Sequence, residues 1–212
     1  MHNRRAYHVP ALTVMLAAIV MVLAPVAQAT KLRTQNLTQL IAESDSIIAG
    51  VVRSVSDGID ENGVPYTEVT ILVSDAAKGS AEKDSEYTFR QFGLLKPRTM
   101  ANGHQYIAMS PEGFPRWRYG ESVVAFMYKP AARTGLQTTA GMAQGKLTLN
   151  DGLLSNDFGN AGLFEGVEID PRRLTAADRE MLNSSGAVDA ATFMSLVGRA
   201  VEGRWVETGE MR

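Results

Sequence analysis

The chain has 212 residues, a formal net charge of −2 and no cysteine, and 45% of its residues are hydrophobic. The absence of cysteine excludes disulfides and a lipoprotein anchor, and the lack of a basic excess argues against a nucleic-acid partner. Only three histidines are present, whereas a zinc site normally needs several His or Cys ligands, so neither a metal nor another cofactor is expected. No glycine-rich phosphate loop occurs.

The first 29 residues have the anatomy of a secretory signal peptide. Arg4 and Arg5 form a basic start, residues 11–23 are largely apolar, and residues 27–29 (Ala-Gln-Ala) offer a small-x-small cleavage site. A membrane-spanning helix needs about 20 apolar residues, which this run reaches only by including polar and helix-breaking positions. The sequence therefore predicts a periplasmic or secreted protein that begins at Thr30 after cleavage and keeps no stable membrane anchor.

A short helix and a central strand are expected after the leader. Residues 37–41 carry leucine and isoleucine at helical spacing, and Asn36 or Thr34 can cap this helix. Residues 46–55 are apolar on both faces in the first half, which is typical of a strand at the centre of a sheet. Gly50 within that strand indicates a bend or bulge.

The next segments predict an antiparallel sheet. Asn62-Gly63 is a strong hairpin signal, and the return strand, residues 66–74, alternates apolar and polar side chains. Similar patterns predict strands at residues 86–92, 121–128 and 136–149.

Five strands behind a short helix predict a mainly β fold with flanking helices. We expect residues 30–150 to form a small antiparallel barrel of the OB (oligonucleotide- or oligosaccharide-binding) type, closed or nearly closed. Residues 151–212 are expected to form a linker and a C-terminal helical segment. Thr175 and Asp178 predict a capping box for one helix, and Asp189 caps a longer helix whose apolar stripe is expected to be a packing face.

Several segments resemble a family of uncharacterised bacterial exported proteins. The matching segments are residues 43–52 (ESDSIIAGVV), 67–73, 78–79 (Lys-Gly), 119–126 (YGESVVAF) and 141–147 (GMAQGKL). The order of elements is also similar to the netrin-like OB barrel of the tissue inhibitors of metalloproteinases. The resemblance implies the fold and an exported location. The animal inhibitors place an N-terminal cysteine on the protease zinc, which this chain cannot do, although the amine of Thr30 is a candidate contact.

The candidate partner-binding residues besides Thr30 are Arg116, Trp117, Arg118 and Tyr119, which lie in a long, proline-punctuated loop. Aromatic residues and arginine are over-represented at binding hot spots. The alternative is that Trp117 plugs one end of the barrel while the arginines stay solvated. His104, the one histidine after the leader, is expected in an exposed turn and not as a catalytic base.

Three functions remain open on the sequence. The first is a non-catalytic binding module for an exported protein such as a protease, so the protein is not expected to be an enzyme. The second is a glycan or envelope-polymer binder, which needs an aromatic-lined groove across the strands. The third is a carboxylate-dependent hydrolase, which needs two acidic side chains facing each other in a pocket. No catalytic, cofactor-binding or metal-binding residue is assigned.

Overall fold

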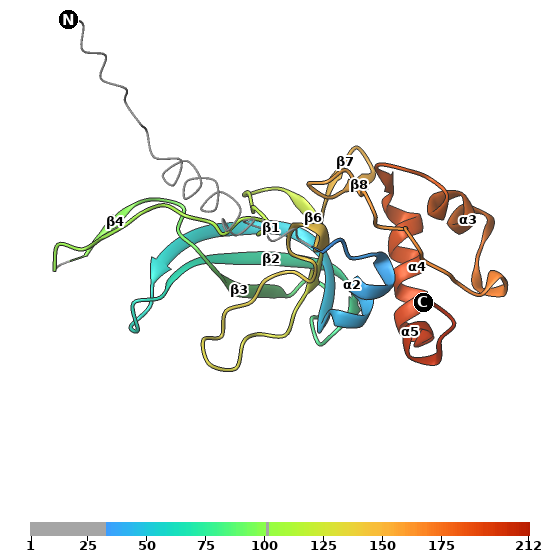
Figure 1. The fold of residues 1–212 in the computed structure, drawn as a ribbon, viewed down its shortest axis with the longest axis horizontal. Coiled ribbons are helices and arrows are strands. Elements are labelled where there is room, and N and C mark those ends of the chain that lie inside the picture. Colours follow the sequence, from blue (N-terminus) through green and yellow to red (C-terminus); the bar gives the residue numbers. More distant parts are fainter. Residues whose placement is uncertain (1–32, 101) are drawn as a thin grey trace, which may run out of the picture. The chain divides into compact units, whose positions relative to one another are not determined.

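An antiparallel β-sheet forms the centre of the fold (Figure 1). The computed structural model describes residues 33–100 and 102–212, so the predicted signal peptide and Thr30 lie outside the described residues. None of the described helices has the length and apolar character that a membrane span requires. The elements, in chain order, are α2 (Leu37–Glu43), β1 (Ser46–Ile59), β2 (Pro65–Lys78), β3 (Glu86–Phe92), β4 (Arg98–Thr99), β5 (Gln105–Tyr106), β6 (Ser122–Met127), the 3-10 helix η1 (Met142–Gly145), β7 (Lys146–Asn150), β8 (Leu153–Ser155), the 3-10 helix η2 (Pro171–Arg173), α3 (Ala176–Leu182), β9 (Val188–Asp189), α4 (Ala190–Glu202) and α5 (Trp205–Thr208).

Seven strands pair in the order β3-β2-β1-β6-β7-β8-β9, all antiparallel, and β4 pairs with β5 in a separate two-stranded ribbon. The predicted hairpin joins β1 to β2, where the Asp60 carboxylate accepts the backbone N–H groups of Asn62 and Val64. Gly50 coincides with a register shift in β1, and a Cβ there would lie 2.2 Å from a carbonyl oxygen of β2. The predicted mainly β, antiparallel fold, its hairpin and the bulge at Gly50 are therefore confirmed.

Two apolar clusters lie on opposite faces of the sheet. Ile47 contributes to one cluster, which includes the buried faces of α2 and α4, whereas its neighbour Ile48 contributes to the other, which lies against Trp117. This division explains why the first half of β1 is apolar on both faces, because successive side chains of a strand point to opposite sides. The apolar stripe of α4 is buried in the first cluster, as the sequence predicts.

The hydrogen-bonded strands form an open sheet with β3 and β9 at its edges, so they do not close into the predicted barrel. Leu136 makes one isolated bridge to Arg90 in β3, and Thr139 makes another to Met127 in β6. The segment 136–140 thus reaches from β3 to β6 without forming a regular strand.

The strand predicted over residues 136–149 is interrupted for a local reason. Gly141 and Met142 have φ angles of 63° and 56°, in the left-handed region that a strand does not use. The chain then makes the turn of η1, in which Gly145 approaches a backbone carbonyl so closely that a Cβ would lie 2.0 Å from its oxygen. Only from Lys146 onward does the chain resume strand geometry as β7.

Residues 151–212 belong to the same compact unit as the rest of the sheet, since Leu32–Arg212 cluster together. The predicted linker contains β8. The turns after β8 are held by Asn156 and Asn160, because the side-chain carbonyl of each accepts the backbone N–H of the other. The predicted caps are confirmed, with a capping box at Thr175 and the Asp189 side chain capping α4.

Candidate binding surface

The chain between β3 and β6 forms two parts of one surface. One part is an arm, and the other is the loop that contains Trp117. The arm is residues 94–109, which contain β4 and β5 and project from the end of the sheet away from α3 and α5 (Figure 1). Asp57, at the end of β1, holds its base by accepting the backbone N–H groups of Leu95 and Lys96 and pairing with Arg98. Burial raises the pKa of Asp57, but these hydrogen bonds outweigh it and leave the pKa lowered.

Trp117 is the buried centre of this surface, with 7% of its area exposed. Its ring meets Phe89 edge-on at 5.2 Å between centroids, and its N–H donates to the Gln91 side chain at 3.3 Å. The ammonium of Lys146 lies 5.3 Å from the ring centroid. Trp117 is therefore a packing residue of the second apolar cluster, and it does not project as an exposed contact.

A buried ion pair beside Trp117 fixes the loop, and sequence reasoning missed it. The ammonium of Lys146, 5% exposed, lies 2.8 Å from the Glu121 carboxylate and also donates to the carbonyl oxygen of Arg116 at 2.7 Å. The same carboxylate accepts the backbone N–H of Arg118 at 2.7 Å. The sequence signal for this pair was the position of Glu121 and Lys146 in residues 119–126 and 141–147, two of the segments that resemble the exported protein family.

The RWRY loop, residues 116–119, has three exposed side chains and one buried side chain. Trp117 points into the protein, whereas Arg116 and Arg118 are exposed and Tyr119 is 76% exposed. The structure therefore brings three of the four predicted residues together at the surface, and the fourth supports them from below. Thr30 lies outside the described residues.

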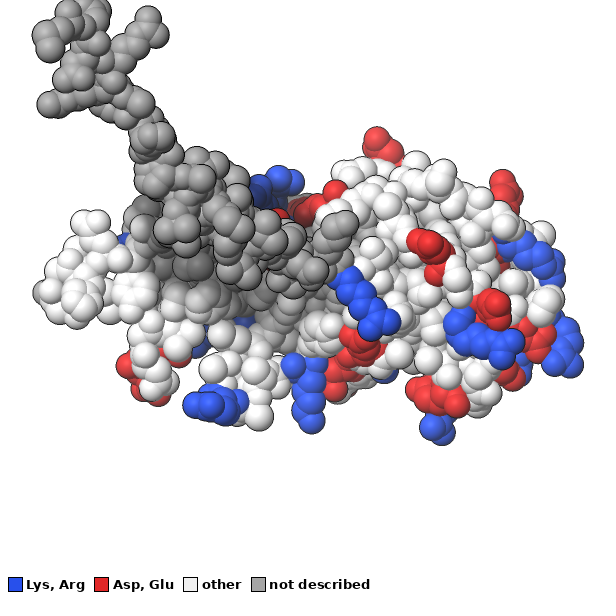
Figure 2. Space-filling model, in the orientation of Figure 1, with Lys and Arg blue, Asp and Glu red and all other residues white. Residues whose placement is uncertain are grey.

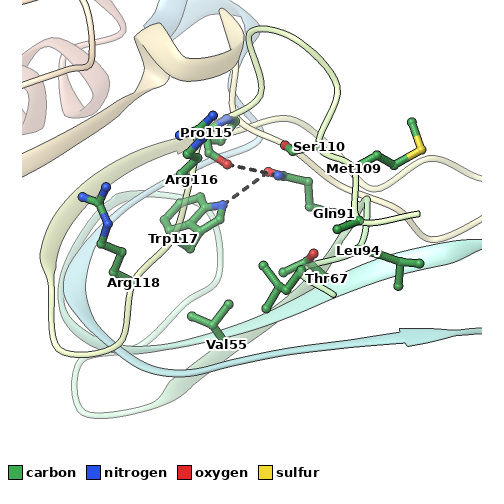
Figure 3. Close-up of a pocket in the computed structure, with 12 residues that line it drawn as sticks. Val55, Thr67, Gln91, Leu94, Met109, Ser110, Pro115, Arg116, Trp117 and Arg118 are labelled. Carbon is green, nitrogen blue, oxygen red and sulfur yellow. Dashed lines mark hydrogen bonds between the residues drawn. The ribbon is translucent and has the colours of Figure 1, made fainter. Parts of the chain in front are cut away.

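A pocket of about 360 Å³ lies between the RWRY loop and the base of the arm. Figure 3 shows Arg118 on one side of Trp117 and Met109 and Leu94 on the other, with Arg116 above the ring next to Pro115. The lining residues are Val55, Thr67, Gln91, Leu94, Leu95, Ala108, Met109, Ser110, Pro115, Arg116, Trp117 and Arg118. This lining contains two arginines and no acidic side chain, so the pocket holds no carboxylate pair for hydrolysis.

The arm adds exposed apolar side chains that the sequence reasoning did not single out. Leu95, Ile107 and Met109 are all exposed, Ile107 to 71%. Residues 99–109 contain no lysine, arginine, aspartate or glutamate, and this was the sequence signal for an apolar surface. Exposed apolar patches of this kind, bordered by polar groups, mark interaction sites in soluble proteins.

Within residues 33–100 and 102–212, no three His, Cys, Asp or Glu side chains group in a way that could hold a metal ion. His104 is exposed in the turn of the arm, where its backbone N–H donates to the Asn102 side chain. Comparison with protein-family models, with curated proteins and with solved structures gives no match.

Proposed function

We propose that this chain is an exported, non-catalytic binding module whose contact surface consists of the arm and the RWRY loop. The observation that carries the proposal is the combination of a pocket with exposed apolar side chains on one border and exposed arginines on the other. Such a surface offers both an apolar anchor site and charged contacts, which are the main parts of a protein-binding hot spot.

The finer fold assignment is also a proposal. We infer that the sheet is a variant of the OB-like, netrin-like barrel, in which residues 136–140 occupy the place of a closing strand. The isolated bridges of Leu136 to β3 and of Thr139 to β6 support this assignment, together with the backbone hydrogen bond of 2.8 Å from Gln137 to Arg90. Because that barrel is similar to the tissue inhibitors of metalloproteinases, an exported protease is the first partner to test.

The glycan and hydrolase alternatives are less well supported by the geometry. A glycan site needs open aromatic faces across the strands, but the guanidinium of Arg90 covers the ring of Tyr66 at 4.2 Å. Near α5, the carboxylates of Asp170 and Glu210 are each paired with an arginine. Tyr66 therefore offers no open aromatic face to a sugar ring, and Asp170 and Glu210 offer no free acid–base pair for hydrolysis.

Site-specific crosslinking tests the binding function. A photoreactive amino acid at Ile107 or Tyr119, on the proposed surface, should yield a discrete adduct with one exported protein in living cells. The matched control is the same amino acid at Lys83, which is exposed in the turn between β2 and β3. Equal labelling from all three positions, or none from Ile107 and Tyr119, would contradict the proposal.

The exported location has its own test. Mass spectrometry of the protein from its host should find an N-terminus at Thr30, because cleavage is expected after Ala29. A membrane-bound product that retains Met1 would show that the leader is an anchor.

A further inference from the structure

The floor of the pocket favours an apolar group from the partner. The Gln91 side chain donates to the carbonyl oxygen of Pro115 at 3.1 Å and accepts from the Trp117 N–H (Figure 3). The hydroxyl of Thr67 donates to the carbonyl oxygen of Gly93. Because these polar groups are already hydrogen-bonded within the protein, an inserted polar group would lose its water without gaining a matched partner.

The border of the pocket formed by the RWRY loop is positively charged, in contrast to the floor. Among the described residues, no acidic side chain forms an ion pair with Arg116 or Arg118. Their backbones are nevertheless held by the buried pair of Lys146 and Glu121. The two guanidinium groups are thus presented from a fixed backbone, which reduces the entropy lost when they bind a carboxylate.

Charge is distributed unevenly between this surface and the remaining chain. Residues 93–120 carry four Lys and Arg and one acidic residue, and of these four Arg98 is paired with Asp57 of β1, whereas residues 33–92 and 121–212 carry fourteen Lys and Arg and twenty-two Asp and Glu. In Figure 2, acidic and basic side chains are intermixed over the end that carries α3 and α5. A cationic surface on an otherwise acidic protein steers an acidic partner toward that surface and repels it elsewhere.

We infer that the partner of this surface is an acidic protein segment that inserts an apolar side chain into the pocket and places neighbouring carboxylates against Arg116 and Arg118. The inference rests on the proposed protein-binding function and adds the chemistry of the partner. The pocket is concave and fits an inserted side chain, which favours a protein segment, whereas the projecting arm with its exposed Ile107 would also fit a lipid surface, so membrane binding is one outcome of the test.

Selection from a displayed library of random decapeptides tests the inference, because such a library covers many partner chemistries at once. The expected peptides have a net negative charge and an apolar residue next to Asp or Glu. The double variant Arg116→Glu/Arg118→Glu should bind these peptides at least about tenfold more weakly, because attraction becomes repulsion. The double variant Lys83→Glu/Lys129→Glu makes the same charge change at exposed positions elsewhere and should bind as the wild type does.

Met109→Gln provides a variant that keeps the charge of the surface, and melting curves establish that each variant is folded. Peptides that depend on Met109 but carry no acidic excess would overturn the acidic partner and leave the proposed binding function standing. If the selected peptides were unaffected by Met109→Gln and by both arginine changes, or if no peptides were selected, both the acidic partner and the proposed binding function would be overturned. Arginine-dependent binding to phosphatidylglycerol vesicles without any selected peptide would assign the surface to a lipid and overturn the inference.

Discussion

Replacing Trp117 by alanine should destabilise the fold strongly while leaving the surface residues in place. A tryptophan side chain buries about 150–250 Å², which at about 25 cal/mol per Å² corresponds to an upper estimate of about 4–6 kcal/mol. Measured large-to-small aromatic substitutions in cores cost about 3–5 kcal/mol. The 7% exposure, the edge contact with Phe89 and the hydrogen bond to Gln91 place Trp117 among such core residues. We therefore expect a loss of about 4 kcal/mol.

Thermal unfolding followed by circular dichroism measures this loss. For a domain of this size about 1 kcal/mol shifts the melting midpoint by about 2–4 °C, so Trp117→Ala should lower it by about 8–16 °C. Trp117→Phe keeps an aromatic ring against Phe89 and should cost less. Tyr119→Ala is the matched control, since its side chain is 76% exposed and its removal should change stability by at most about 0.5 kcal/mol. If Trp117→Ala melted with the Tyr119 control, the assignment of Trp117 to the core would be refuted.

Three further changes test the contacts that support this surface and the C-terminal helices. Glu121→Gln should cost about 3–5 kcal/mol in urea unfolding, because the Lys146 ammonium remains buried without its counter-charge; a loss below about 1 kcal/mol would contradict a buried pair. Burial raises the pKa of Asp178, but hydrogen bonds from Thr175 and from Arg199 of α4 outweigh burial, so the pKa is lowered. The Asp178 carboxylate therefore stabilises the fold at neutral pH, and this stabilisation is lost as the pH falls through the lowered pKa. Asp178→Asn should flatten the fall in stability on acidification below about pH 5, and an unchanged slope would count against this role of the Asp178 carboxylate. Gly145→Ala should lower the melting temperature through a cost of about 1–3 kcal/mol, whereas Gly198→Ala, where the new methyl group meets nothing within 4 Å, should not.

The sequence by itself determined the local elements of this protein. The capping boxes at Asn36 and Thr175 and the hairpin turn at Asn62-Gly63 follow from side chains that bond to backbone groups only a few residues away. The alternation along β2 likewise follows from strand geometry, so its buried face was predictable. These features do not depend on distant contacts, and the structure contains each of them.

Only the tertiary structure decided how the binding surface is built. An Arg-Trp-Arg-Tyr sequence is compatible with an exposed or a buried tryptophan, and the packing of Trp117 on Phe89 and Lys146 selects the buried state. Lys146 and Glu121 are 25 residues apart, and no local pattern brings them together. The predicted strand over residues 136–149 gives way to the η1 turn where Gly141 and Met142 take left-handed φ angles, which the residue pattern of this segment does not reveal. Contacts between distant segments have no fixed spacing in the sequence, so the buried ion pair and the pocket are decided only when the chain folds.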